Sequence, residues 1–185
     1  MRNRDFWINQ AFFQASWPAC VIGAANGLVW PGPLLVGAFA LWQLHPSRAA
    51  RTDLAVVGLF AVTGLLLDTL WLQSGLVAYA LGGPVQGMTP AWLMALWVAL
   101  GLSVNHSLAV FQQRWLAFAL LASVASPLSY RFAAELGAVQ WTGPDWLVVL
   151  AVGPIWGVAV AALFRFARSI RVDDTDSKIV RMVRG

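Results

Sequence analysis

Long apolar runs, separated by short breaks that carry charges, glycines or prolines, form the main pattern along this chain. About 20 apolar residues in a row are enough to cross a bilayer as a helix. The pattern therefore predicts an all-α integral membrane protein, a bundle of six transmembrane helices in one domain over residues 1–166, followed by a basic cytoplasmic tail over residues 167–185. The expected spans are residues 8–30, 31–45, 54–73, 91–111, 115–139 and 146–166.

Two stretches depart from a regular span pattern. The second expected helix is short, ~24 Å at the helical rise, so it would cross only where the bilayer thins or a polar neighbour surrounds it. Residues 74–90 carry no charge and are broken by Gly82, Gly83 and Pro84. This stretch is either an external loop lying on the membrane or a re-entrant segment buried against protein, and its Gly and Pro residues favour the loop.

Basic residues mark one end of every expected span. With six spans, all twelve Lys and Arg residues except Arg131 fall on the same side of the membrane, which the positive-inside rule makes the cytoplasmic side. Both termini are therefore expected in the cytoplasm of a bacterium, with the bundle in its inner membrane. The tail is expected to be mostly disordered, with a short amphipathic segment on anionic lipid as the alternative.

Composition supports a membrane protein and excludes several other classes. Hydrophobic residues make up 59% of the chain and charged residues 11%, whereas soluble domains carry about 25% charged residues. The net charge of +4 is explained by membrane orientation, so we expect no nucleic-acid partner. The chain has no recognisable catalytic motif, which disfavours an enzyme. With Cys20 as the single cysteine and no acidic cluster spaced to hold magnesium, we expect no metal and no cofactor.

A few ionisable residues lie inside the expected spans. Each costs about 2.5 to 3.5 kcal/mol to insert, so such residues generally face the protein interior and find partners. Asp68 and Arg131 are expected at similar depth, and Glu135 follows Arg131 by one helical turn, so an Asp–Arg–Glu cluster is predicted, with Asn26 at the same level. This cluster is either an ion pair that locks helices together or a pocket for a headgroup, a solute or a proton.

Two further polar groups lie on the fourth and fifth expected helices. His106 lacks a second metal-ligating residue one turn away, so hydrogen bonding between helices is favoured over a role as base or ligand. Serines and Tyr130 surround Pro127, where hydroxyls can satisfy the carbonyls that the proline frees. The predicted polar groove of the third, fourth and fifth spans comprises Asp68, Asn105, His106, Ser129, Tyr130, Arg131 and Glu135, with Asn26 nearby.

Four strings of residues stand out along the first five expected spans. They are WPACVIGAANG (17–27), GLLLDTLW (64–71), VNHSLAVF (104–111) and SPLSYRFAAELGAV (126–139). Together they resemble the bacterial inner-membrane family known as domain of unknown function 2878. In that family, the Arg131 position is aromatic and the Glu135 position more often basic. The resemblance therefore implies that the better candidates for a shared site are Asp68, Asn105, His106, Ser129 and Tyr130.

Three functions fit these features. The resemblance implies a lipid-linked role, because family members are associated with genes for cyclopropane fatty acid synthase and membrane-lipid stress. The leading hypothesis is therefore a protein that binds or handles a membrane lipid, or assists a lipid-modifying enzyme, through the polar groove. The alternatives are a small proton-coupled transporter or permease-like subunit, and a structural membrane partner.

Overall fold

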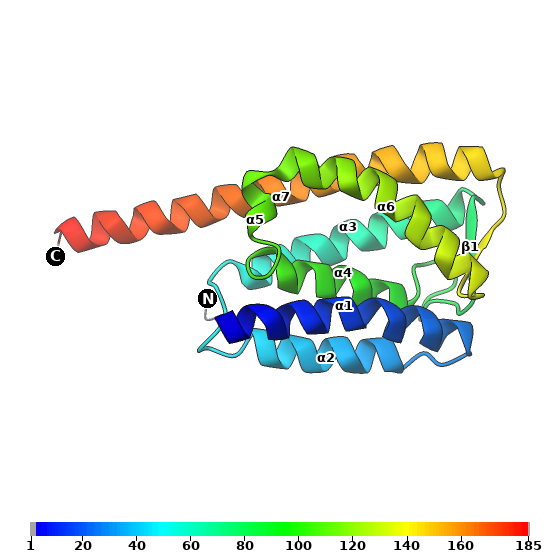
Figure 1. The fold of residues 1–185 in the computed structure, drawn as a ribbon, viewed down its shortest axis with the longest axis horizontal. Coiled ribbons are helices and arrows are strands. Elements are labelled where there is room, and N and C mark those ends of the chain that lie inside the picture. The colour runs from blue at the N-terminus through cyan, green and yellow to red at the C-terminus, as the bar shows by residue number, and fades with distance from the viewer. Residues whose placement is uncertain (1–2, 185) are drawn as a thin grey trace.

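The computed structural model describes residues 3–184, with side chains described for residues 3–171 (Figure 1). Every expected span coincides with a helix over most of its length, so the protein is predominantly helical. The elements of this part of the chain are α1 (Asn3–Ala25), α2 (Pro31–Gln43), α3 (Asp53–Gln73), β1 (Val77–Tyr79), α4 (Ala91–Val104), α5 (Val110–Gln113), α6 (Trp115–Glu135), β2 (Val139–Trp141) and α7 (Asp145–Arg184).

The helices form two groups that share one long axis (Figure 1). In the first group, α1, α2 and α4 pack against one another, and α3 packs against α4. In the second group, α6 and α7 pack mainly against each other. Contacts of α7 with α3 and α5 join the groups, as do the two strands at one end of the bundle. The candidate site lies between the two groups.

Two glycines end helices earlier than the apolar pattern predicts. Gly27 and Gly137 have positive φ angles of 76° and 90°, a left-handed conformation that glycine adopts at little cost. In each case the following N–H bonds back to a carbonyl five residues earlier, which closes the helix end. The expected ends at residues 30 and 139 are therefore wrong, because α1 ends at Ala25 and α6 at Glu135.

The stretch over residues 74–90 contains a strand that the sequence did not predict. β1 pairs antiparallel with β2, with Val77 opposite Trp141 and Tyr79 opposite Val139. The remainder of the stretch is a loop at the same end of the bundle (Figure 1). The all-α expectation therefore omits a two-stranded sheet. A strand of three residues is too short to show a clear alternation of apolar and polar positions. In addition, the two strands are about 60 residues apart in the sequence, so their pairing leaves no local signal.

Two other helix boundaries also differ from expectation. The fourth span was expected to reach residue 111, but α4 ends at Val104 and five residues in turns precede α5. The side chain of Asn105, which follows α4, bonds to Asp53 at the start of α3, and the backbone turns here instead of continuing the helix.

The tail also differs from expectation. α7 continues to Arg184, so the tail is helical where a mostly disordered segment was predicted. No Gly or Pro interrupts residues 158–184, which is consistent with an unbroken helix.

Small residues let α6 and α7 approach closely. A Cβ atom on Gly157 would lie 2.0 Å from the Ser123 hydroxyl oxygen, and one on Gly153 would lie 2.6 Å from the Ser123 carbonyl oxygen. That carbonyl is the one that Pro127 leaves without its usual helical donor. The nearby serine hydroxyls do not bond to it: that of Ser123 donates to Ala119, that of Ser129 accepts from Trp17, and that of Ser126 has no partner. The expectation that hydroxyls repair the kink is therefore wrong, and the backbone of α7 packs over it instead.

The outer surface of the bundle is suited to lipid. Within the described residues, three helical segments are long and apolar enough to cross a membrane, namely Asp53–Gln73, Trp115–Glu135 and Asp145–Arg171, and α4 is a shorter apolar helix. Many large apolar side chains on these segments are exposed, including Leu54, Leu66, Leu120, Val124, Leu128, Leu150 and Val158. Exposed apolar surface of this extent marks a membrane or protein interface. The structure is thus consistent with a helical membrane protein.

Candidate functional site

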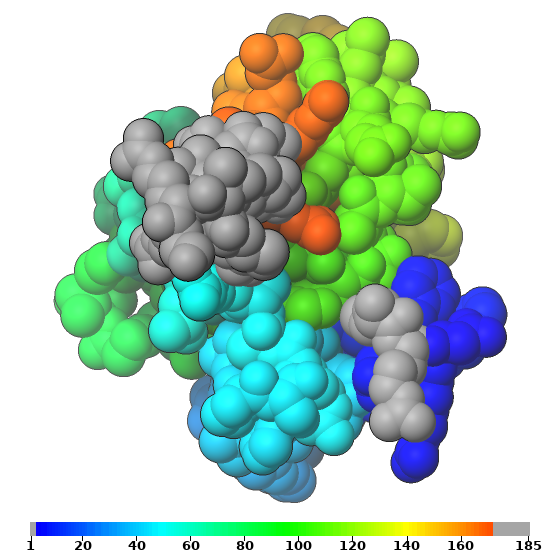
Figure 2. Space-filling model, turned by 90° about the vertical axis from the view of Figure 1, so that its left-hand side faces the viewer, coloured from blue at the N-terminus to red at the C-terminus, as the bar shows by residue number. Residues whose placement is uncertain are grey.

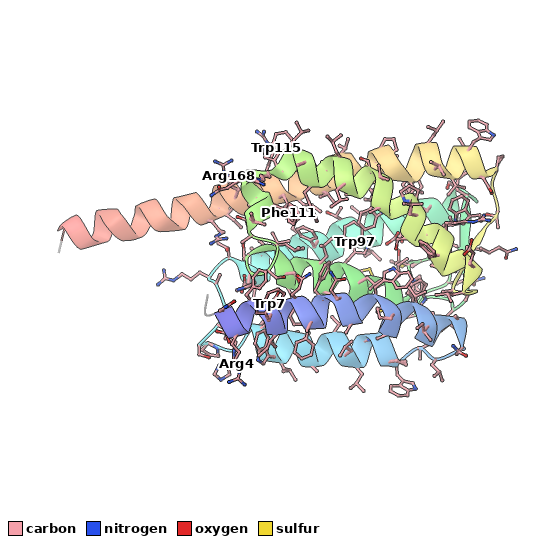
Figure 3. The ribbon with its side chains drawn as sticks, viewed as in Figure 1. Arg4, Trp7, Trp97, Phe111, Trp115 and Arg168 are labelled. Atoms are coloured by element: carbon pink, nitrogen blue, oxygen red, sulfur yellow. The ribbon has the colours of Figure 1, made fainter. Side chains whose placement is uncertain are left out.

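An apolar chamber of about 550 Å³ lies between the two helix groups. Its walls come from α1, α4, α6 and α7, and Phe111 of α5 closes part of it. Figure 3 shows Trp97 and Phe111 between the α6–α7 pair and α1. The other lining residues include Phe13, Trp17, Leu93, Leu96, Leu100, Phe118, Leu121, Ala122, Ser126, Tyr130, Trp156 and Val160. The volume falls within the roughly 300–1,000 Å³ typical of small-molecule sites.

Aromatic and hydroxyl groups shape the chamber wall. Trp97 of α4 stacks on Trp156 of α7, with ring centroids 4.3 Å apart and an interplanar angle of 20°. The indole N–H of Trp17 donates to the hydroxyl of Ser129 at 2.7 Å and thereby links α1 to α6. The hydroxyl of Ser126 is buried without a hydrogen-bond partner. The chamber wall is therefore mainly apolar, and the unpartnered hydroxyl of Ser126 lies buried within it.

The link between Trp17 and Ser129 gives a first prediction. Because α1 and α6 have few other contacts, this hydrogen bond should hold the two chamber walls at a fixed separation. Replacing Ser129 by Ala should lower the free energy of unfolding by about 1 kcal/mol, the usual contribution of one such bond. A double-mutant cycle with Trp17→Phe measures the coupling. Fully additive effects of the two substitutions would show that the bond contributes nothing.

Asp68 lies directly behind the chamber wall. The side chain is fully buried at 0% exposure, and the indole N–H of Trp97 donates to its Oδ2 at 2.6 Å. The phenol of Tyr130 donates to Oδ1, and the phenol of Tyr79 approaches the same oxygen at 3.5 Å. A buried carboxylate is tolerated when several donors surround it. Here all three donors are neutral, so the carboxyl is satisfied by hydrogen bonds rather than by an ion pair.

Local structure brings the donors of Asp68 together. Gly64 lies one turn before Asp68 on α3, and the ring of Trp97 fills the space that a side chain there would occupy. β1 carries Tyr79 back toward α3, where its hydroxyl also lies 3.3 Å from the Asp68 backbone carbonyl oxygen. Burial and the nearby Asp68 carboxyl raise the pKa of the Tyr79 phenol far above its ordinary value, so this phenol stays protonated.

A second polar cluster lies at the opposite end of the bundle. Asp53, at the start of α3, is 1% exposed, and its two carboxyl oxygens contact Asn105 Nδ2 and His106 Nε2, each at 2.8 Å. Gln43 Nε2 of α2 lies 3.0 Å from the same His106 nitrogen. Asn9 of α1 donates to Gln43 Oε1 at 2.7 Å. These bonds tie α1, α2, α3 and the α4–α5 turn together.

Figure 2 looks onto this end of the molecule, where the segment between α2 and α3 lies beside the start of α1. The cluster is extended by Gln112 of α5, whose amide donates to the Asn105 side-chain oxygen at 2.9 Å. Ser107 donates to Asn9 Oδ1 at 2.5 Å. Because nearly every polar atom of the cluster has a partner, it acts as a structural clamp on the helix ends.

The predicted single groove is therefore wrong, because its residues fall into separate places. Asp68 and Tyr130 meet behind the chamber, and Ser129 lies on the chamber wall. Asn105 and His106 belong to the cluster around Asp53 at the other end. The preference for hydrogen bonding between helices over a catalytic role for His106 agrees with this placement.

The expected contact between Asp68 and Arg131 is also wrong. Arg131 is half exposed and pairs with Glu135 at 3.4 Å and with Asp145 at 3.5 Å. Successive residues of a helix point about 100° apart. Because Tyr130 faces Asp68, the next residue, Arg131, points away from Asp68 and outward. Only the Arg131–Glu135 pair on one helix face is confirmed. Asn26 is exposed and bonds to a carbonyl of its own helix.

Several residues of both clusters were missed at the level of sequence. Tyr79 and Trp97 complete the environment of Asp68, and Asn9, Gln43 and Asp53 complete that of His106. Asn9 and Gln43 gave a usable signal, since both are polar residues inside apolar runs. No group of three or more His, Cys, Asp or Glu residues that could hold a metal occurs in the part of the chain that the structure describes.

Comparison with known proteins identifies a family but no function. The model of the family described as "protein of unknown function (DUF2878)" matches residues 6–162. This range includes all the walls of the chamber, Asp68 and the Asp53 cluster. No curated protein and no solved structure matches the chain.

Proposed function

Since the chain belongs to the family of proteins of unknown function DUF2878, we propose that this family member binds the hydrocarbon part of a membrane lipid in the apolar chamber. The single observation that carries the proposal is the chamber itself, which is lined mainly by aliphatic and aromatic side chains, with Gln10, Gln14 and three serines among them. Water would find few polar partners there. An empty cavity of this size would forfeit many dispersion contacts. A hydrocarbon chain satisfies the wall without either cost.

Three residues of the chamber wall carry polar atoms without a hydrogen-bond partner, namely Ser126, Trp92 and Trp156. These atoms are fully buried within the wall rather than exposed to the chamber. They therefore give no indication of a polar group on the ligand, and the proposal concerns its hydrocarbon part.

The proposal includes a six-span topology with both termini in the cytoplasm of a bacterial cell. Arg4 of α1 and Arg168 of α7 lie at the same end of the bundle (Figure 3). At inner ends of the expected spans, the guanidinium groups of Arg48 and Arg165 lie over tryptophan rings at 4.9 Å, as expected for an interface anchored by Trp and Arg. α2 and α4 have 13 and 14 residues, or about 20 Å, and thus require a locally thin bilayer.

The test is native mass spectrometry of the protein released from detergent. We expect the wild type to retain about one lipid, and Ala122→Phe, which places a ring in the chamber, to reduce the retained fraction by about tenfold. Val124→Phe is the matched control, because it adds the same ring to the exposed face of α6. Equal lipid retention by both variants would contradict the proposal. A wild type without lipid, combined with solute flux in proteoliposomes, would favour a transporter instead.

A further inference from the structure

Asp68 lies between two cavities, which suggests a role beyond structural support. The first is the apolar chamber, which Tyr130 and Trp97 line. The second, here called the loop cavity, has a volume of about 580 Å³ and is lined by Gln73, Tyr79, Gly82, Gln86, Met88 and neighbouring residues. Tyr79 belongs to the wall of the loop cavity and also reaches Asp68. The carboxyl is thus one side chain away from each cavity.

We propose that Tyr79 and Asp68 form a proton path from the loop cavity to the wall of the apolar chamber, with Asp68 as the site that holds the proton and Tyr130 as its hydrogen-bond partner. This inference goes beyond lipid binding and does not depend on it. The loop cavity opens among the exposed residues Gln73, Gly82 and Gln86, at the end of the bundle opposite the chain termini (Figure 1). The proton therefore enters from the non-cytoplasmic side of the proposed topology.

The two oxygens of the carboxyl have different partners, and this difference allows a proton to bind. Oδ2 accepts from the indole of Trp97, which is only a donor and cannot receive a proton. Oδ1 faces two phenols, and a phenol oxygen both donates and accepts. When Asp68 is ionised, both phenols can donate to Oδ1. When Oδ1 carries a proton, it donates to one phenol oxygen while that phenol's own O–H turns away.

Proton transfer follows from the same geometry. A hydronium ion in the loop cavity gives a proton to the Tyr79 oxygen, and Tyr79 passes its own hydroxyl proton to Asp68 Oδ1. The products are water, a neutral phenol and a neutral carboxylic acid. The acid then donates a hydrogen bond to the Tyr130 oxygen, and the proton stays on Asp68. The remaining helix near Asp68 is α7. The side chain that it contributes there is Trp156, which stacks on Trp97 and does not titrate.

Infrared difference spectroscopy of the protein in lipid nanodiscs tests whether Asp68 holds an exchangeable proton. Lowering the pH from about 9 to about 5.5, where exposed carboxyl groups stay ionised, should produce the carbonyl band of a protonated carboxylic acid. Asp68→Asn should abolish this band, and Glu135→Gln, an exposed carboxyl of α6, should leave it unchanged. The asparagine is isosteric and can still accept from Trp97. If this variant does not fold, isotope-labelled aspartate identifies the band in the wild type.

The route is tested by the rate at which that band shifts after transfer to heavy water. Tyr79→Phe should slow the exchange by about tenfold or more, the effect of about 1.4 kcal/mol on a barrier. Gln140→Ala, a change on the exposed face of the paired strand β2 and outside the loop cavity, should leave the rate unchanged. A band that does not vary with pH, or an equal exchange rate in Tyr79→Phe and Gln140→Ala, would overturn the proposal. Lipid retention in these variants is measured separately, so loss of the proton path and loss of lipid binding are distinguishable.

Discussion

Replacing Asp53 by alanine is expected to lower the free energy of unfolding by about 3–5 kcal/mol, because it leaves several buried donors without an acceptor and each costs about 1–3 kcal/mol. The substitution leaves His106 without its 2.8 Å contact and removes the acceptor for the backbone N–H of Ala50. The side-chain nitrogen of Asn105 loses a 2.8 Å bond as well and retains only the hydroxyl of Thr52. Because the cluster joins α1, α2 and α3 to the α4–α5 turn, its loss should loosen the whole end of the bundle.

The matched control for Asp53→Ala is Asp145→Ala. Asp145 is exposed and contacts Arg131 at 3.5 Å on the surface, so its loss should cost at most about 1 kcal/mol. Chemical unfolding in detergent, followed by tryptophan fluorescence, measures both variants. Similar free energies of unfolding for the two would show that the cluster does not clamp the helix ends.

Replacing Gly64 by alanine is expected to have the second largest effect. The new Cβ atom would lie 2.1 Å from the Trp97 ring, so the indole must move. It would then lose its 2.6 Å bond to Asp68 and its stacking on Trp156. Overpacking and the lost bond to a carboxyl together should lower the free energy of unfolding by about 2–4 kcal/mol.

Gly58→Ala provides the control for this substitution. Gly58 lies on the same helix, and a Cβ atom there would meet nothing within 4 Å. Since alanine is a better helix former than glycine, this variant should be neutral or slightly more stable. The same unfolding measurement compares the two. If Gly64→Ala were as stable as Gly58→Ala, Trp97 would not be held in place by this close approach.

The helices could be predicted because their signals are local. Apolar runs and the breaks between them lie within single segments, and the i,i+4 pair of Arg131 and Glu135 also follows from spacing on one helix. The early ends of α1 and α6 depend on the positive φ angles of Gly27 and Gly137. Glycine is compatible with such a turn but does not require it, so those ends could not be placed from composition alone.

The environment of Asp68 could not be predicted because it depends on long-range packing. Tyr79 reaches Asp68 only because β1 pairs with β2, and Trp97 reaches it only because Gly64 leaves room on α3. Depth in the membrane suggested Arg131 as the partner, but depth does not specify which side of α6 a residue occupies. The contact between His106 and Asp53 could not be predicted for the same reason. Asp53 lies at the edge of its span, and its burial depends on the α4–α5 turn.

Photocrosslinking with a phospholipid that carries a photoreactive acyl chain tests the central claim most directly. Lipids around the bundle will label outward-facing residues such as Leu120 and Leu150 in any case. Binding in the chamber predicts additional labelling of Leu96, Leu100 and Trp156, which Ala122→Phe abolishes and Val124→Phe preserves. Labelling confined to the outward-facing residues in the wild type would contradict the account.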